Sequence, residues 1–148
     1  MFFPRPFFSP QPFPRLFFSR RGDEFAETAI AMPVIVLVTI ALMNLTMAGF
    51  ASVNANNAAN YGARVGSVHQ QGPASAAYTA AQQSTAYASV GDYTVAVSGG
   101  GFPGAQINVQ VDWSVPNLMG GLLGFFGGDS SDTDIKGMAM SVFRQEGW

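Results

Sequence analysis

The longest apolar run of the chain lies between Ala29 and Phe50 and reads AIAMPVIVLVTIALMNLTMAGF. It contains three polar residues, Thr39, Asn44 and Thr46, and no charged residue occurs from Thr28 to Ala63. About 20 predominantly apolar residues in a helix cross the ~30 Å hydrocarbon core of a bilayer, and a helix satisfies its own backbone hydrogen bonds in lipid. The pattern therefore predicts one transmembrane helix over about residues 28–50.

The predicted helix is longer than its membrane segment. Acidic side chains suit the positive end of the helix dipole, so the helix is expected to begin near Asp23 or Glu24 and to continue to about His69, a helical region over 23–70. Beyond the membrane, small residues recur at spacings of three and four: Ala55, Ala58, Ala59, Gly62 and Gly66. Such a stripe allows close helix packing, against either another subunit or this chain's own sheet.

A second, shorter helix is expected over 74–88. Gly72 can take the C′ position that ends the first helix, and Pro73 suits the first turn of the next. Gly91 and Asp92 then break the second helix. One face of it carries Ala77, Ala81, Ser84 and Ala88.

Alternation at period two follows, which is the signature of strands. It covers Tyr93–Ser98, Ile107–Val115 and Lys136–Gln145, and the third run has Met138, Met140 and Val142 on one face. Three strands with one apolar face need a helix to cover that face. The predicted fold class is therefore α+β: a long N-terminal transmembrane α-helix extends into an exported domain over 71–148, with a short second helix and a small three-stranded antiparallel sheet.

The connection between the second and third strands is apolar and glycine-rich. LMGGLLGFFGG, from Leu118 to Gly128, is interpreted either as a patch that touches a partner or the membrane, or as a flexible loop folded over the sheet. The acidic DSSDTD that follows, residues 129–134, lacks the glycine and the terminal glutamate of an EF-hand. No calcium site is expected there.

Charge is unevenly distributed along the 148 residues, of which 48% are hydrophobic and 11% charged. Arg5, Arg15, Arg20 and Arg21 precede Gly22 without an acidic residue among them, whereas three basic residues face nine acidic ones after it. The positive-inside rule places the N-terminus in the cytoplasm and the C-terminal domain outside the cytoplasmic membrane. The part after Gly22 is not expected to bind nucleic acid, because it is acidic and such binding requires clustered Lys and Arg.

The residue types that carry catalysis are sparse. The chain has no cysteine and a single histidine, His69, which excludes disulfides and the usual zinc sites. No Gly-x-Ser-x-Gly motif is present, and the glycine-rich loop from Gly99 to Gly104 precedes a strand and not a helix, so it does not form a phosphate cradle. We expect no enzyme activity, no cofactor and no metal.

Residues 1–22 form a basic leader rich in Pro and Phe. Its five prolines rule out a continuous helix. It is either an interfacial segment near anionic lipid or a removable leader without a partner of its own. A cleaved secretory signal and a buried core helix remain alternatives for the apolar run.

Arg20, Arg21 and Gly22 are followed by DEFAETAIAMP, in which Glu27 is the fifth residue after Gly22 and Pro33 the eleventh. This motif resembles the TadE/TadG-like family of the Tad (tight adherence) pilus, a branch of the type IV pilin-like proteins. Asn57–Arg64 is similar to the family's stretch just beyond the membrane, and Met138–Glu146 more loosely to its closing strand. Thr28 stands where the family usually has Phe or Tyr.

The resemblance implies a minor pilin or pseudopilin that a prepilin peptidase processes. Gly22 would precede the cut, Asp23 would become the first residue, and Glu27 would pair with the new N-terminal amine of its own or a neighbouring subunit. Glycine lets an active site approach the backbone, and a carboxylate near the membrane is normally paired. Glu27 as an ordinary acid of the first helical turn is the alternative.

The implied partners are other pilin-like subunits through the N-terminal helix, the peptidase and the lipid bilayer. The competing hypothesis is an uncleaved single-pass accessory subunit of another membrane complex.

Overall fold

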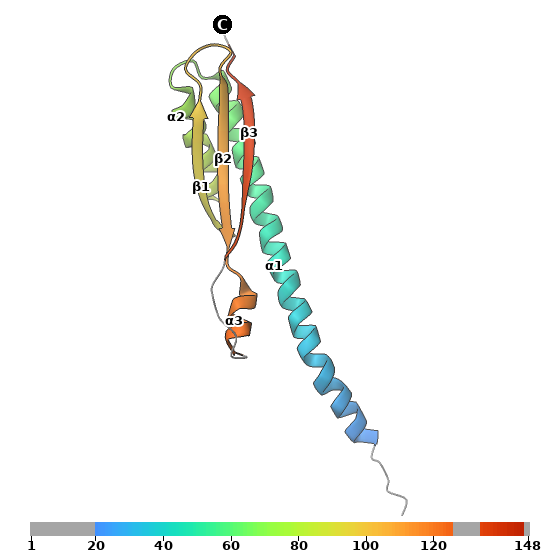
Figure 1. Cartoon of the computed structure of the whole chain (residues 1–148). Coiled ribbons are helices and arrows are strands. Elements are labelled where there is room, and N and C mark those ends of the chain that lie inside the picture. Colours follow the sequence, from blue (N-terminus) through green and yellow to red (C-terminus); the bar gives the residue numbers. More distant parts are fainter. Residues whose placement is uncertain (1–19, 126–133, 147–148) are drawn as a thin grey trace, which may run out of the picture. The chain divides into compact units, whose positions relative to one another are not determined.

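The computed structural model describes residues 20–125 and 134–146 of the chain (Figure 1). The elements in chain order are α1 (Arg20–Val68), α2 (Pro73–Ala86), β1 (Asp92–Gly99), β2 (Gln106–Val115), α3 (Leu118–Phe125) and β3 (Ile135–Arg144). They confirm the predicted α+β class, with a long apolar helix, a short second helix and a three-stranded antiparallel sheet. The chain divides into two compact units, Met1–Val36 and Leu37–Trp148, and the second contains everything from the middle of α1 onward.

α1 is 49 residues long and contains Pro33. It begins at Arg20, three residues before the predicted start at Asp23. Arginine is a good helix former, so helical backbone continues upstream of the acidic residues that the prediction relied on. The helix ends at Val68, where the His69 amide bonds the Gly66 carbonyl at 3.3 Å.

The turn after α1 differs in one respect from the prediction. Gly72 has left-handed dihedrals, φ 65° and ψ 51°, and is the N-cap of α2. It was predicted to be the C′ residue of the first helix, but α1 ends four residues earlier. Pro73 does occupy the first turn of α2, as predicted, and the Gly72 carbonyl accepts the Ala76 amide at 3.1 Å.

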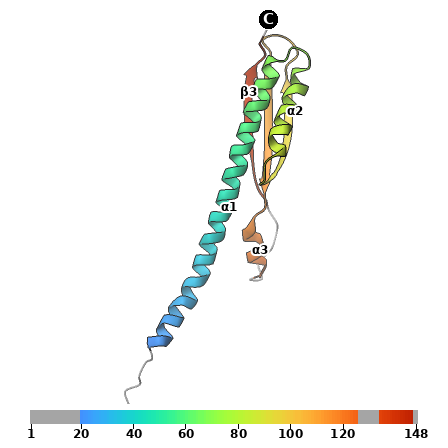
Figure 2. The same ribbon diagram turned by 180° about the vertical axis from the view of Figure 1, so that it is seen from behind.

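The sheet has the strand order β1-β2-β3, and both neighbouring pairs are antiparallel. The register aligns Val95 with Val111 and Val111 with Ala139 across the three strands. Because side chains alternate between faces, these three residues lie on the same face. Figures 1 and 2, viewed from opposite sides, show α2 and the C-terminal part of α1 on that one side of the sheet. No helix among the described residues covers the other face.

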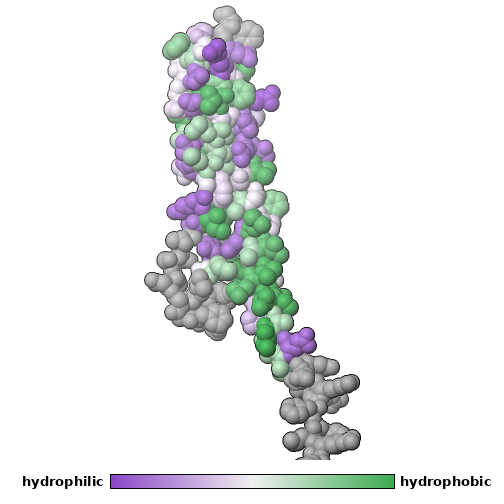
Figure 3. All heavy atoms as spheres, turned by 45° about the vertical axis from the view of Figure 1, so that its right-hand side comes forward, coloured by the Kyte–Doolittle hydropathy of each residue, from purple (hydrophilic) through white to green (hydrophobic). Residues whose placement is uncertain are grey.

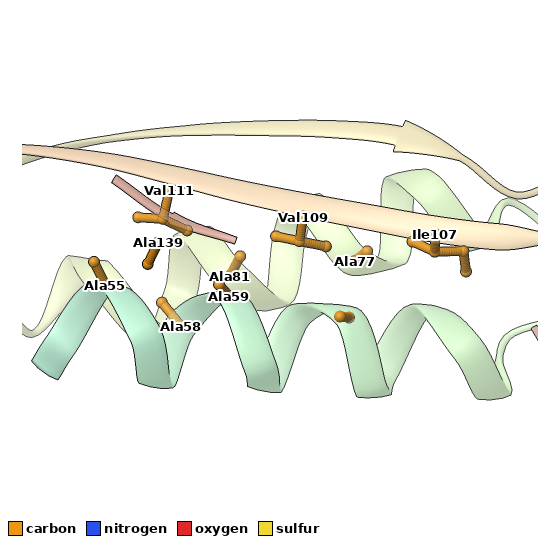
Figure 4. Close-up of a cluster of buried hydrophobic side chains, with 10 residues drawn as sticks. Ala55, Ala58, Ala59, Ala77, Ala81, Ile107, Val109, Val111 and Ala139 are labelled. Atoms are coloured by element: carbon orange, nitrogen blue, oxygen red, sulfur yellow. The ribbon is translucent and has the colours of Figure 1, made fainter. Parts of the chain in front are cut away.

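The core between these layers is built largely from small side chains (Figure 4). The buried cluster consists of Ala55, Ala58, Ala59, Ala63, Ala77, Ala81, Ile107, Val109, Val111 and Ala139. Alanines on both helices therefore face the branched residues of the central strand β2. Alanine and glycine permit a short distance between the helix axes and the sheet, so the domain packs closely without large aromatic residues at its centre.

The exposed face of β3 is the reverse of what the sequence suggested. Met138, Met140 and Val142 do share a face, but they are 67%, 58% and 48% exposed, so the expectation that this apolar face is covered was wrong. The covered side instead carries Ala139 and Ser141. α1 lies so close to β3 that Ser141 Oγ donates a hydrogen bond of 2.8 Å to Asn60 Oδ1. A methionine does not fit into so narrow a space, and it lies on the outer face instead.

The segment after β2 was considered as a flexible loop, and its first part is a helix. α3 spans Leu118–Phe125, and its first two amides donate to side-chain oxygens. Residues 126–133, which include the rest of the predicted apolar loop and most of the acidic run, lie outside the described part of the chain.

A substitution at Gly62 tests the close packing of α1. An added Cβ would lie 2.8 Å from the Ala77 carbonyl oxygen and 2.8 Å from Ala81 Cβ. Gly62→Ala should destabilise the domain by about 1–3 kcal/mol, measured by thermal unfolding of the micelle-bound protein. Gly49→Ala on the same helix is the control, because its Cβ would have nothing within 4 Å; it should be neutral or stabilising by up to ~1 kcal/mol. Equal effects at both sites would contradict the packing described here.

Candidate functional site

The apolar part of α1 is the clearest functional feature of the described chain. The helix from Phe25 to Val68 is long and apolar enough to cross a membrane, and only 6% of its most apolar stretch is buried within the protein. Figure 3 shows hydrophobic residues gathered over this part of α1. The large exposed residues include Phe25, Ile30, Ile35, Val38, Leu42, Leu45 and Phe50. Exposed apolar surface of this extent is compatible with a single-pass membrane protein and consistent with membrane insertion.

Polar side chains within the predicted span have hydrogen-bond partners. Thr46 Oγ1 donates to the Leu42 carbonyl of its own helix at 2.8 Å, which removes its need for water. Asn44 is only 8% exposed. Its Nδ2 donates to Asn117 Oδ1 at 2.9 Å, and its Oδ1 accepts the Leu118 amide at 3.1 Å. Asn44 therefore connects α1 to the start of α3.

Three amides at the N-terminus of α3 have acceptors on these two asparagines. Besides the Leu118 amide, the Met119 amide donates to Asn117 Oδ1 at 3.1 Å, and the Gly120 amide to the Asn117 carbonyl at 3.2 Å. The first amides of a helix have no partner within the helix and usually bond a cap or water. At α3 the first three all bond protein atoms.

The predicted processing residues lie in the first turns of α1. Arg20, Arg21, Gly22 and Asp23 have helical backbone, and their side chains lie outside the described part of the structure. Glu27 follows on the same helix and is exposed. The structure therefore places these positions in order along one helix and leaves the Glu27 carboxylate accessible.

The predicted packing stripe is buried inside this chain. Ala55, Ala58, Ala59, Gly62 and Gly66 are all buried. A Cβ at Gly66 would lie 2.7 Å from Ala77 Cβ and 2.9 Å from the Pro73 carbonyl oxygen, so α2 occupies the space beside this glycine. Of the two partners considered for the stripe, this chain's own sheet and second helix cover it. A contact with another subunit would use other surfaces of α1.

Ligand-type side chains do not gather into a metal centre among the described residues. No group of three or more His, Cys, Asp or Glu side chains in this part of the chain could hold a metal ion. His69 is exposed at the end of α1, with Nδ1 2.9 Å from the Val65 carbonyl oxygen. Of the acidic run, Asp134 is described and exposed, whereas Asp129 and Asp132 lie outside the described residues.

Sequence reasoning missed the contact between Asn44 and Asn117. Two signals pointed toward it: an asparagine inside an otherwise apolar span has to find a partner, and an asparagine directly before an apolar run is a typical N-cap. The two residues are 73 positions apart, so nothing local connects them.

Comparisons with known proteins add no relative. A scan against family models, a search of curated proteins and a search of solved structures each return no match to this chain. The resemblance to TadE/TadG-like proteins therefore stays a prediction based on the motif between Arg20 and Pro33 and the segments that follow it.

An arginine in the middle of the apolar stretch tests whether α1 lies in lipid. Val38 and Val53 are both exposed on α1, at 54% and 58%, but only Val38 lies within the predicted span. Val38→Arg should reduce the membrane-inserted fraction, because arginine near the centre of a span costs about 2.5–3.5 kcal/mol in insertion. Val53→Arg should leave it nearly unchanged. Carbonate extraction of the full-length protein measures both, and equal insertion of the two variants would show that Val38 does not lie in hydrocarbon.

Proposed function

We propose that this protein is a minor pilin or pseudopilin, a non-catalytic structural subunit of a Tad-like surface pilus or of its assembly machinery. In this proposal the N-terminus lies in the cytoplasm, α1 anchors the subunit in the cytoplasmic membrane, and the α+β domain is exported. The observation that carries the proposal is the division of α1 into two parts with different surroundings. Residues 25–50 expose apolar side chains on most sides, whereas residues 51–67 bury one face in the domain.

The exposed apolar part explains how one helix could serve both as an anchor and as an assembly element. In the membrane, lipid covers this apolar surface and keeps it out of contact with water. If the subunit left the bilayer, the same surface would have to be covered by apolar helices of other subunits. The stripe at residues 55–66 is already occupied within the chain, so the subunit contact would use the surface around residues 25–50.

The charge distribution supports the orientation. Four arginines precede Gly22, and no basic residue occurs between the apolar stretch and Arg64. By the positive-inside rule the leader stays in the cytoplasm, where a membrane-embedded prepilin peptidase would meet the Gly22–Asp23 bond. The exposed position of Glu27 supports its proposed role, because a carboxylate that pairs with the amine of a neighbouring subunit has to be accessible.

The mass of the mature protein tests processing directly. Expressed with a prepilin peptidase, the chain should lose residues 1–22 and begin at Asp23, as read by intact mass and N-terminal sequencing. Gly22→Val should block the cleavage, because a branched side chain prevents close approach to the backbone at that bond. Gly49→Val adds the same side chain to an open position of the same helix and should be cleaved like the unmodified protein. A mature chain that retains residues 1–22 in the presence of active peptidase would contradict the processing step.

Replacement of Glu27 tests its role in assembly. Glu27→Ala should insert into the membrane and be cleaved as usual. It should be recovered at least ~10-fold less with other pilin-like subunits, because the ammonium group of a neighbouring subunit loses the carboxylate that would pair with it in the contact. Glu24→Ala removes the same charge three residues upstream and serves as the control. Equal recovery of the two variants would favour Glu27 as an ordinary first-turn acid.

The second candidate is an uncleaved accessory subunit of another membrane complex. It is favoured by the start of α1 at Arg20, because the helix continues through Gly22 and Asp23 and forms an intact anchor without any cut. The mass measurement separates the two candidates, since only this one retains the aromatic leader.

A further inference from the structure

We propose that α3 is a second membrane-embedded element, a short helix that enters the exported-side leaflet beside α1 and contacts lipid acyl chains. This inference goes beyond the proposed function. It depends on the membrane span of α1 and not on cleavage or on pilus assembly. The proposed partner of α3 is thus the bilayer. From the sequence alone, the segment that contains α3 could be either a patch touching a partner or the membrane, or a loop folded over the sheet.

α3 contacts α1 within the predicted membrane span. Asn44 binds the Leu118 amide, and it lies six residues before Phe50, the end of the predicted span. At 1.5 Å per residue this places Asn44 about 9 Å inside the apolar region. Figures 1 and 2 agree that α3 lies beyond the end of the sheet and beside α1. The start of α3 is therefore held at the depth of lipid tails.

The groove between the two helices supports the same depth. An open hollow of about 450 Å³ lies between Leu118 and α1. On the side of α1 it is lined by Thr39, Leu42, Met43, Thr46 and Met47. All five belong to the predicted membrane span. Leu118 is 40% exposed beside Leu42 and Met43, which are 58% and 54% exposed. The apolar surface of the span thus continues from α1 onto α3.

Independently of this depth, the backbone amides at the start of α3 have hydrogen-bond partners in the protein. A helix that begins in water can leave its first amides to solvent, whereas in hydrocarbon every unpaired amide is costly. The amides of Leu118, Met119 and Gly120 all donate to protein acceptors. The sequence of α3, LMGGLLGF, contains no polar side chain. Asn44, which would be an expensive residue in a membrane helix, is explained as the group that makes this insertion possible.

The absence of cysteine from the chain allows a test with single-cysteine variants of the full-length protein in phosphatidylcholine vesicles. Gly121→Cys reports on α3, because Gly121 is exposed and an added Cβ has nothing within 4 Å. Leu42→Cys reports on the span, and Thr94→Cys, on the uncovered face of β1, reports on water. Each cysteine is treated with a membrane-impermeant maleimide, and in parallel carries a fluorophore quenched by nitroxides attached to lipid tails.

Cysteine at 121 should behave like cysteine at 42. Its reaction with the maleimide should be about 10-fold or more slower than at 94, because hydrocarbon disfavours the reactive thiolate, and the lipid nitroxides should quench its fluorophore. Rapid reaction without quenching would place α3 in water and overturn the proposal. Slow reaction without lipid quenching would mean that a protein surface, such as a second copy of the chain, covers α3, which also overturns it. Aqueous behaviour at both 42 and 121 would overturn it together with the membrane span.

A second pair of variants tests the role of Asn44. Asn44→Leu removes the acceptor of the Leu118 amide, so nitroxide quenching at position 121 should fall toward the value at 94 while α1 remains inserted. Thr46→Val removes a hydroxyl whose hydrogen bond goes to its own helix, and it should leave the quenching at 121 unchanged. Unaltered quenching in Asn44→Leu would show that the asparagine does not hold α3 in the membrane.

Discussion

The close contact between α1 and the layer formed by the sheet and α2 is the constraint on which the rest of the domain depends. It exists because alanine and glycine occupy the buried face of α1 between Ala55 and Gly66, and alanines of α2 meet them. The short separation leaves room only for small side chains on β3, so Ala139 and Ser141 face the helix. The short separation also explains why Met138 and Met140 lie on the outer face. Their hydrophobic character alone predicts a position in the core.

The same helix meets two environments, and its residue types change accordingly. Along residues 25–50 most side chains are apolar and exposed, which suits lipid or the apolar helices of neighbouring subunits. Along the following residues the buried positions are small, and polar residues such as Asn56, Asn57 and Arg64 occur among the exposed positions. A single continuous helix therefore joins an exposed apolar segment to the part of the chain that packs on the sheet and α2. This arrangement is the physical basis of the pilin-like function proposed here.

Asn44 shows how a polar residue can be accommodated in an apolar helix. Both its donor and its acceptor are used, toward Asn117 and the Leu118 amide, and the described residues contain no buried side-chain nitrogen or oxygen atom without a partner. The cost of removing an amide from water is offset where each of its groups is bonded. The pair also bonds the first amides of α3, so one buried contact positions the start of this helix beside α1.

The sequence alone determined α1, α2, the three strands and the apolar span, since these depend on local patterns: the length of an apolar run, the alternation of Ile107–Val115, and Pro73 at the start of α2. It missed the helical state of α3, the covered face of β3 and the function of Asn44. Each of these depends on residues far apart in the chain, such as Ser141 and Asn60, or Asn44 and Asn117. Only the tertiary structure decides such contacts, because an amphipathic pattern shows which residues share a face but not how closely the opposite layer approaches it.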